Sequence, residues 1–173
     1  MLPDPRKVSR KLVTVALLAA LGACQTVPRH PGFSAKQVAA LQGAGFHEED
    51  GNYELGVANR VLFGFDESAV IPDSAGMLKQ LSSVLLGVGI HGAMIEGHTD
   101  SVGNAAYNMD LSLKRASSVR DLVVAGGMNP EEVRTKGLGA TDPIASNATE
   151  TGRQENRRVV ILVTPADAAP LKP

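Results

Sequence analysis

The stretch at residues 93–125 constrains the fold most, because it places three different kinds of segment in series. Residues 93–97 ("AMIEG") are typical of a short strand, and a polar loop of small and capping residues follows. Tyr107, Leu111 and Val119 then recur at helical spacing, up to the glycine pair at 126–127. We therefore expect a strand that leads through a polar turn into a long helix.

Similar alternation on both sides of this stretch predicts the fold class. Apolar residues at helical spacing over 77–88 indicate a second helix, which Asp73 can cap. Apolar runs typical of strands lie at 60–65, 133–139 and 157–164. This order predicts an α+β fold, a two-layer sandwich with helices packed on a mixed sheet.

The residues before the first of these strands predict two small elements. Ser34 is a suitable N-cap for a short helix that ends near Gly43. The turn residues Asp50, Gly51 and Asn52 predict a β-hairpin. A short N-terminal helix and a hairpin should therefore precede the main sandwich.

The N-terminus has the pattern of a secretion signal. Four basic residues are followed by an apolar run at 12–21, which is too short to span a bilayer because about 20 apolar residues are needed. The residues at 21–24 ("LGAC") resemble a bacterial lipobox, in which the cysteine is lipidated. The alternative is an ordinary signal with an incidental cysteine. Cys24 is the only cysteine, so no disulfide can form within the chain.

Five segments follow from these patterns. We expect a lipoprotein signal peptide at 1–23, a tether at 24–32, an N-terminal helical switch segment at 33–50, the main domain at 51–167 and a loose tail at 168–173. Gln25 follows the lipobox cysteine, and in Gram-negative lipoproteins this resembles the pattern exported to the outer membrane. The predicted location is the outer membrane, with a lipid anchor and the domain facing the periplasm.

Composition excludes several classes of function. Aromatic residues are 3% of the chain and the formal net charge is −1, so neither base stacking nor a basic field favours nucleic acid. The histidines have no HExxH spacing, and there is no G-x-S-x-G motif. The glycines at 137 and 139 are not followed by a predicted helix, which excludes a dinucleotide fingerprint. We predict no enzyme, no cofactor and no metal site.

Three blocks in order resemble the OmpA C-terminal-like family of peptidoglycan-binding domains. They are "VLFGFDESAVIPDS", "GHTDSVGNAAYNMDLSLKRASSV" and "KGLGATDPIASNATETGRQENRRVVI". The segment at 33–64 is further similar to the outer-membrane lipoproteins of tripartite cyclic-di-GMP control systems. In such systems the lipoprotein captures a periplasmic repressor that otherwise holds a diguanylate cyclase inactive.

The resemblance implies a ligand and a set of contacts. The ligand would be the diaminopimelate of the peptidoglycan stem, which carries an ammonium and a carboxylate on one carbon. Asp100 would accept hydrogen bonds from the ammonium, and Arg115 would hold the carboxylate through its planar fork. The supporting residues by motif position are Phe65, Asp66, Thr99, Asn108 and Leu111.

Other roles remain open for several of these residues. Thr99, Asp100 and Asn108 could cap the helix and tie its loop, and Arg115 could be a solvated helix charge. The arginines at 157 and 158 are expected to brace the last strand rather than touch ligand.

Four apolar residues exceed what a tether requires: Val38, Leu41, Phe46 and Tyr53. They could dock on the domain, or they could form a surface that is released to meet a partner. The predicted partners are peptidoglycan, the outer membrane through the lipid, and a periplasmic repressor protein. The alternative is a passive tether between outer membrane and peptidoglycan with no role in signalling.

Overall fold

The computed structural model describes residues 32–64 and 67–168. The predicted signal peptide, Cys24, nearly all of the tether and most of the tail lie outside these residues, as do Phe65 and Asp66. In chain order the helices are α1 (Ala35–Gly43), α2 (Asn59–Leu62), α3 (Pro72–Leu86), α4 (Ala105–Ala125) and α5 (Glu150–Asn156). The strands are β1 (His47–Glu49), β2 (Asn52–Ala58), β3 (Ala93–His98), β4 (Val133–Gly139) and β5 (Arg158–Val163), and a 3₁₀ turn, Pro165–Asp167, follows.

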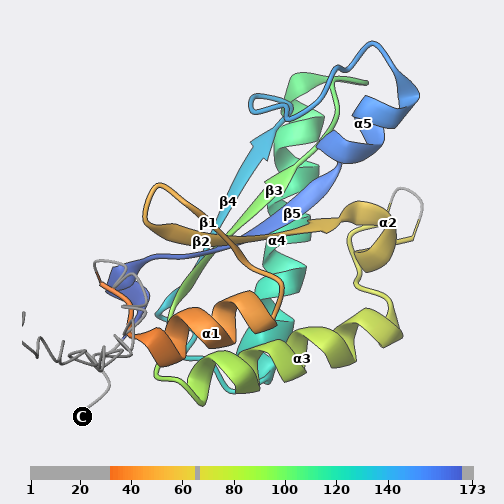
Figure 1. Cartoon of the computed structure of the whole chain (residues 1–173). Coiled ribbons are helices and arrows are strands. Elements are labelled where there is room, and N and C mark those ends of the chain that lie inside the picture. Colours follow the sequence, from red (N-terminus) through yellow and green to blue (C-terminus); the bar gives the residue numbers. More distant parts are fainter. Residues whose placement is uncertain (1–31, 65–66, 169–173) are drawn as a thin grey trace, which may run out of the picture.

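The strands form one mixed sheet in the order β1-β2-β5-β3-β4. Only β3 and β4 run parallel, and the other neighbours are antiparallel. Helix α4 packs against β3 and β4, α3 packs on α4, and α1 packs on α3 (Figure 1). The predicted α+β sandwich with a mixed sheet is confirmed.

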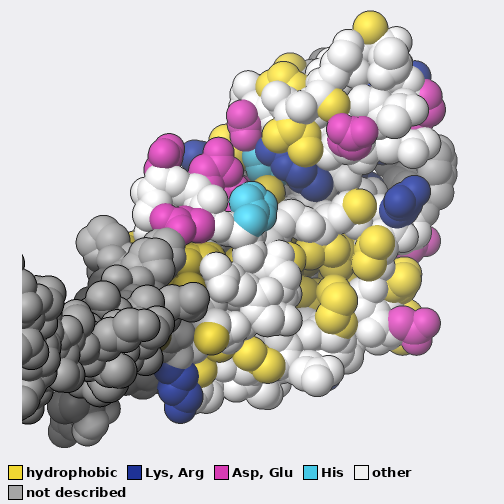
Figure 2. Space-filling model, viewed as in Figure 1, with side chains coloured by type: hydrophobic (Ala, Val, Ile, Leu, Met, Phe, Trp, Pro, Cys, Tyr) yellow, Lys and Arg dark blue, Asp and Glu magenta, His cyan; other side chains and the backbone are white. Residues whose placement is uncertain are grey.

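Alternation along the strands places the core between the sheet and the helices. On β5, Val159, Ile161 and Val163 are almost fully buried, and they join Leu78 and Val119 of the helices in one apolar cluster. Residues on the opposite face of the sheet include charged side chains, and Figure 2 shows acidic side chains gathered over the β1–β2 hairpin. The buried face therefore carries most of the hydrophobic stabilisation.

Two glycines allow α4 to lie unusually close to the sheet. A Cβ atom at Gly97 of β3 would lie 2.0 Å from the backbone oxygen of Ser112, and one at Gly137 of β4 would lie 2.8 Å from Leu113. No larger residue fits at either position without moving the helix. The spacing between β3 and α4 is thus set by contact with bare backbone.

The predicted N-terminal elements are present. The Ser34 side chain accepts a hydrogen bond from the Gln37 backbone amide, and the Gln37 side-chain oxygen accepts one from the Ser34 backbone amide, which forms a capping box for α1. Asp50 and Gly51 both have positive φ, of 49° and 79°, as a tight two-residue hairpin turn requires. The boundary expected between residues 50 and 51 falls inside this turn.

The prediction of a strand at residues 60–65 is wrong. Ala58 pairs with Arg158, the first residue of the antiparallel β5, so beyond Ala58 no residue of β5 remains to pair with the chain. The chain instead closes one helical turn, α2, with Phe63 donating to the Asn59 carbonyl at 2.8 Å. Phe63 then forms only an isolated bridge with Val70.

Two further expectations need correction. Asp73 does not cap α3, because Ile71 is the N-cap and Pro72 is the first helical residue. Asp73 lies in the first turn, where its charge complements the helix dipole. The segment between β4 and β5, for which no regular element was predicted, contains α5, whose N-cap Thr149 accepts a hydrogen bond from Gly152.

Candidate functional site

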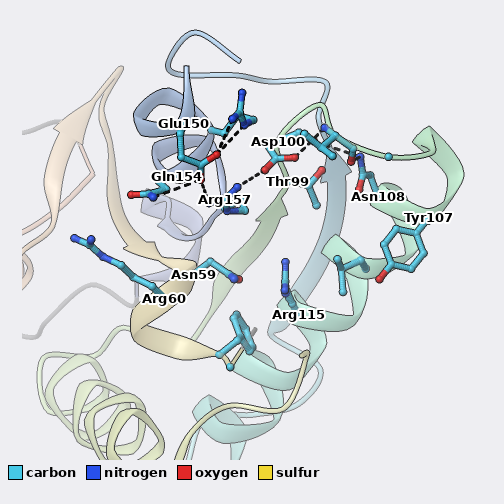
Figure 3. Close-up of a pocket in the computed structure, with 16 residues that line it drawn as sticks. Asn59, Arg60, Thr99, Asp100, Tyr107, Asn108, Arg115, Glu150, Gln154 and Arg157 are labelled. Carbon is cyan, nitrogen blue, oxygen red and sulfur yellow. Dashed lines mark hydrogen bonds and ion pairs between the residues drawn. The ribbon is translucent and has the colours of Figure 1, made fainter. Parts of the chain in front are cut away.

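A pocket of about 940 Å³ lies where the end of β3 meets α2, α4 and α5 (Figure 3). It brings together segments that are up to about 100 positions apart in the chain. Five of the predicted site residues line it: Thr99, Asp100, Asn108, Leu111 and Arg115. The other lining residues are Asn59, Arg60, Phe63, Gly64, Val102, Gly103, Tyr107, Glu150, Arg153, Gln154 and Arg157.

The loop between β3 and α4 presents Asp100 to this pocket. Asp100 Oδ1 accepts a hydrogen bond of 2.9 Å from the Val102 amide, which turns the loop back on itself. Asn108 Nδ2 donates to the carbonyl oxygens of Asp100 and Val102, at 3.3 and 3.0 Å. Asn108 therefore ties the loop, which is the structural role considered above beside contact with a ligand. The N-cap of α4 is Asn104, a residue that sequence reasoning did not single out.

Arg115 reaches the pocket from α4, two turns after Asn108. Its side chain is only 4% exposed, so it is not a solvated helix charge. Arg115 Nε donates to the Glu67 backbone oxygen at 2.9 Å, and the guanidinium carbon lies 5.4 Å from the centroid of the Phe63 ring. A buried guanidinium needs partners of this kind, and they hold its plane in one orientation.

Arg157 is a pocket residue that sequence reasoning missed. It ends α5, and because the backbone is extended there, its side chain and that of Arg158 point to opposite sides. Arg157 Nη1 donates to Asp100 Oδ2 at 2.5 Å, and Nη2 donates to Glu150 Oε1 at 2.9 Å. Arg158 turns away to the Asp142 carboxylate at 3.3 Å. The side chain of Arg157 therefore lines the pocket and pairs with Asp100 and Glu150, whereas Arg158 is not among the lining residues.

Helix α5 adds alternating charges beside Asp100. Glu150 accepts hydrogen bonds from Arg157 and, through its other oxygen, from Arg153 at 2.7 Å. These hydrogen bonds, from Arg157 first and then Arg153, lower the pKa of Glu150 to about 2. The carboxylate is therefore ionised at any physiological pH. The Thr149 cap followed by Glu150 was a signal in the sequence that could have revealed this helix.

The hydroxyl of Thr99 is a polar group without a partner within the described residues. Thr99 is 5% exposed, and its Oγ1 makes no hydrogen bond there, although its amide donates to the Gly139 carbonyl at 2.8 Å. A buried hydroxyl left unsatisfied costs about 1–3 kcal/mol. Thr99 itself is one of the residues that line the pocket beside Asp100.

His98, directly before Thr99, is buried on the opposite side of the strand from the core. Burial, followed by the charge of Arg158, lowers the pKa of His98 to about 4, and the nearby Asp142 carboxylate only partly opposes this. His98 is accordingly neutral at pH 7. It does not line the pocket.

The four residues predicted for a switch all lie in the core. Val38, Leu41, Phe46 and Tyr53 are each buried, and Leu41 and Tyr53 have no exposed surface. The Tyr53 ring meets that of Phe33 edge to face, with centroids 5.3 Å apart. In this structure the N-terminal segment is packed on its own domain.

A group of three possible metal ligands lies on the hairpin, away from the pocket. His47, Glu49 and Glu54 each offer an atom within 4.8 Å of the others. His47 and Glu49 are exposed, and exposed acidic groups are common without a metal ion. The cluster carries no assignment of function.

Comparison with known proteins identifies the family. The sequence profile of the OmpA family matches residues 62–157. The chain belongs to the OmpA family. The resemblance of the three sequence blocks is thereby confirmed.

Two relatives extend the similarity to the N-terminal part. The outer-membrane lipoprotein YfiB of Pseudomonas aeruginosa is 41% identical over 94% of this chain and 98% of its own length. The putative lipoprotein YfiB of Escherichia coli K12 is 41% identical over 76% of this chain and 83% of its own length. These relatives confirm that the resemblance to outer-membrane lipoproteins extends to the N-terminal part, and they confirm the outer-membrane, lipid-anchored location.

A solved structure supports the fold. The peptidoglycan-associated lipoprotein from Burkholderia pseudomallei is 30% identical, with a TM-score of 0.53 over 58% of this chain and 86% of that one. Within residues 32–64 and 67–168, no helix has the length and apolarity needed to cross a membrane.

Proposed function

We propose that this protein binds the stem peptide of peptidoglycan in the pocket and so links the outer membrane to the cell wall. The observation that carries the proposal is the presence of Asp100 and Arg115 on the walls of one pocket, both nearly buried. An ammonium and a carboxylate on one carbon need an anion and a cation that face one space. Burial strengthens both contacts, because screening by water and salt is weaker there.

Each end of the pocket has donors or acceptors suited to this ligand. Among the residues that the structure describes, Asp100 Oδ1 and Oδ2 each accept one hydrogen bond, and a carboxylate oxygen can accept two. Arg115 is oriented through its Nε by the Glu67 carbonyl, and a guanidinium carries five N–H donors in a fixed plane. Leu111 supplies an apolar surface for the methylene chain of diaminopimelate.

Sedimentation with purified sacculi tests this proposal. The wild-type lipoprotein in detergent should pellet with sacculi, whereas Asp100→Asn should remain largely in the supernatant. Asp110→Asn is the matched control, because Asp110 is an exposed acid on α4 that pairs with Lys114 at 2.7 Å. Equal pelleting of Asp100→Asn and wild type would contradict the assignment.

We further propose a signalling role, in which the N-terminal segment is released from the domain to capture a periplasmic repressor of a diguanylate cyclase. Two findings support this: the similarity over 94% of the chain to lipoprotein YfiB, and the burial of an extra helix that a tether would not need. Gln37 Nε2 also donates to the Val88 carbonyl at 3.1 Å, a buried hydrogen bond that breaks if α1 leaves. The passive tether remains the alternative, and the Leu41 variants described below separate the two.

A further inference from the structure

The end of the pocket that contains Asp100 also contains an arginine, Arg157. A site for one ammonium and one carboxylate needs only Asp100 and Arg115, so Arg157 is an additional charge. Arg157 lies between two carboxylates, Asp100 from the β3–α4 loop and Glu150 from α5, and it donates a hydrogen bond to each (Figure 3). Asp100 follows β3, whereas Glu150 and Arg157 lie at the two ends of α5. Arg157 is the group that joins them.

This arrangement leaves Asp100 nearly immobile. Its Oδ1 is held by the Val102 amide, its Oδ2 by Arg157, and its backbone oxygen by Asn108. The remaining acceptor positions on the carboxylate therefore point in defined directions. Thr99 lines the pocket beside them, and its buried hydroxyl has no partner within the described residues. Together they form a small polar corner.

We propose that Arg157 is a positioning residue that orients Asp100, and that Glu150 offsets the charge of Arg157 so that an ammonium group can bind in this corner. The inference rests on the proposed binding of the stem peptide. Arg157 alone would repel an ammonium. Glu150 accepts hydrogen bonds from Arg157 at 2.9 Å and from Arg153 at 2.7 Å, and its negative charge reduces the repulsion that these two arginines would exert on an ammonium.

Direct binding measurements with two soluble probes test the proposal. One is a stem tetrapeptide with meso-diaminopimelate, and the other is the same peptide with the free side-chain ammonium acetylated. Arg157→Gln should bind the first probe about tenfold more weakly than wild type, because Asp100 loses a charge-assisted hydrogen bond that holds it. For the acetylated probe, which lacks the side-chain ammonium, wild type and Arg157→Gln should bind equally weakly.

Double variants show whether Arg157 acts through Asp100. In an Asp100→Asn background, Arg157→Gln should cause no further loss, because the carboxylate it orients is gone. Arg157→Lys should recover part of the affinity, since one ammonium can reach only one of the two carboxylates well. Fully additive losses would overturn the positioning role.

The salt dependence of binding distinguishes the contribution of Glu150 from that of Arg157. Glu150→Gln should weaken binding about threefold at low salt, and this difference from wild type should vanish near 1 M salt, where the Debye length is about 3 Å. The loss in Arg157→Gln should persist, because orientation is not screened.

Arg158→Gln is the matched control, because Arg158 is the next residue in the chain and its side chain points to Asp142, outside the pocket. Its melting temperature, measured beside that of Arg157→Gln, corrects for any loss of folding. If Arg157→Gln keeps wild-type affinity for the first probe, this inference fails while peptidoglycan binding stands. If wild type itself does not bind that probe, the proposed function fails.

Discussion

Arg115 Nε donates a hydrogen bond of 2.9 Å to the backbone oxygen of Glu67, so α4 and the segment before α3 are joined at the pocket wall. The same guanidinium stacks over Phe63. The side chain thus supports the fold as well as the proposed binding of a carboxylate. A change at this position should alter stability and affinity together, and each needs its own measurement.

Arg115→Ala should weaken binding to sacculi by about tenfold to 150-fold, the cost of a lost charge-assisted pair. It should also lower the free energy of unfolding by roughly 1–3 kcal/mol, because the Glu67 carbonyl loses its partner. The sequence alone predicts little change in stability. Sedimentation and thermal melts provide the two readouts. Lys114→Ala, next to it but exposed, should change neither; a matching loss there would contradict the assignment.

Cys24→Ser should prevent lipidation and remove the protein from the outer-membrane fraction. The physical reason is that no other part of the described chain offers a segment able to cross a bilayer. Fractionation followed by gel mobility is the measurement. Recovery of the variant in the outer-membrane fraction with unchanged mobility would refute the lipobox.

Leu41→Pro should raise cellular cyclic-di-GMP and the capture of a periplasmic repressor, if release of α1 is the signal. Proline breaks the short helix, and loss of the buried leucine removes about 1.5–3 kcal/mol of packing, enough to shift such an equilibrium about tenfold to 150-fold. The measurements are the nucleotide level and a pull-down with the purified lipoprotein.

Two companion variants separate the two causes. Leu41→Ala removes the packing but keeps the helix, and Ala39→Pro breaks the helix at an exposed position. Both should act in the same direction as Leu41→Pro. If Leu41→Pro is stable and exported yet neither readout moves, the passive tether is the correct function.

His98 should make the folded state less stable in acid. Its pKa of about 4 in the folded protein lies below the ordinary value of 6.5, so the unfolded chain takes up this proton first as the pH falls. Stability is therefore fully present above pH 6.5 and declines by up to about 3 kcal/mol as the pH falls to 4. The charged groups facing the ring are Asp142, Arg158 and Lys136.

Urea unfolding at several pH values measures this effect. His98→Gln should flatten the slope between pH 6.5 and 4, whatever its stability at neutral pH. His91→Gln, at an exposed position, should keep the wild-type slope. A wild-type slope in His98→Gln would exclude His98 as the cause.

Periodicity and turn residues predicted the parts of the fold that depend on local pattern. The stripe that became α3, the Asp50–Gly51 turn and the strand at 93–98 all carry their signal within a few residues. The strand expected at 60–65 failed for a reason outside its own residues. Its apolar pattern suits a strand, but the antiparallel neighbour β5 begins only at Arg158, which already pairs with Ala58.

The candidate site was predictable only in part. Family motifs identified Asp100 and Arg115, which do line one pocket. Arg157 could not be found in this way, because its direction depends on where α5 ends and β5 begins. A shift of one residue would exchange the directions of Arg157 and Arg158. Glu150 was missed along with the helix that carries it.

The glycine contacts between β3 and α4 have a consequence for ligand size. Asp100 follows the end of β3, whereas Arg115 is carried by α4, so the gap between the two charges depends on how these elements are stacked. Because no side chain lies between Gly97 and the backbone of Ser112, no side-chain rearrangement can change the spacing of the two elements there. The distance between Asp100 and Arg115 is therefore fixed by the packing of α4 on β3. We expect that a small slide of the helix cannot adjust this distance to a zwitterion whose two charges are one bond closer together or farther apart.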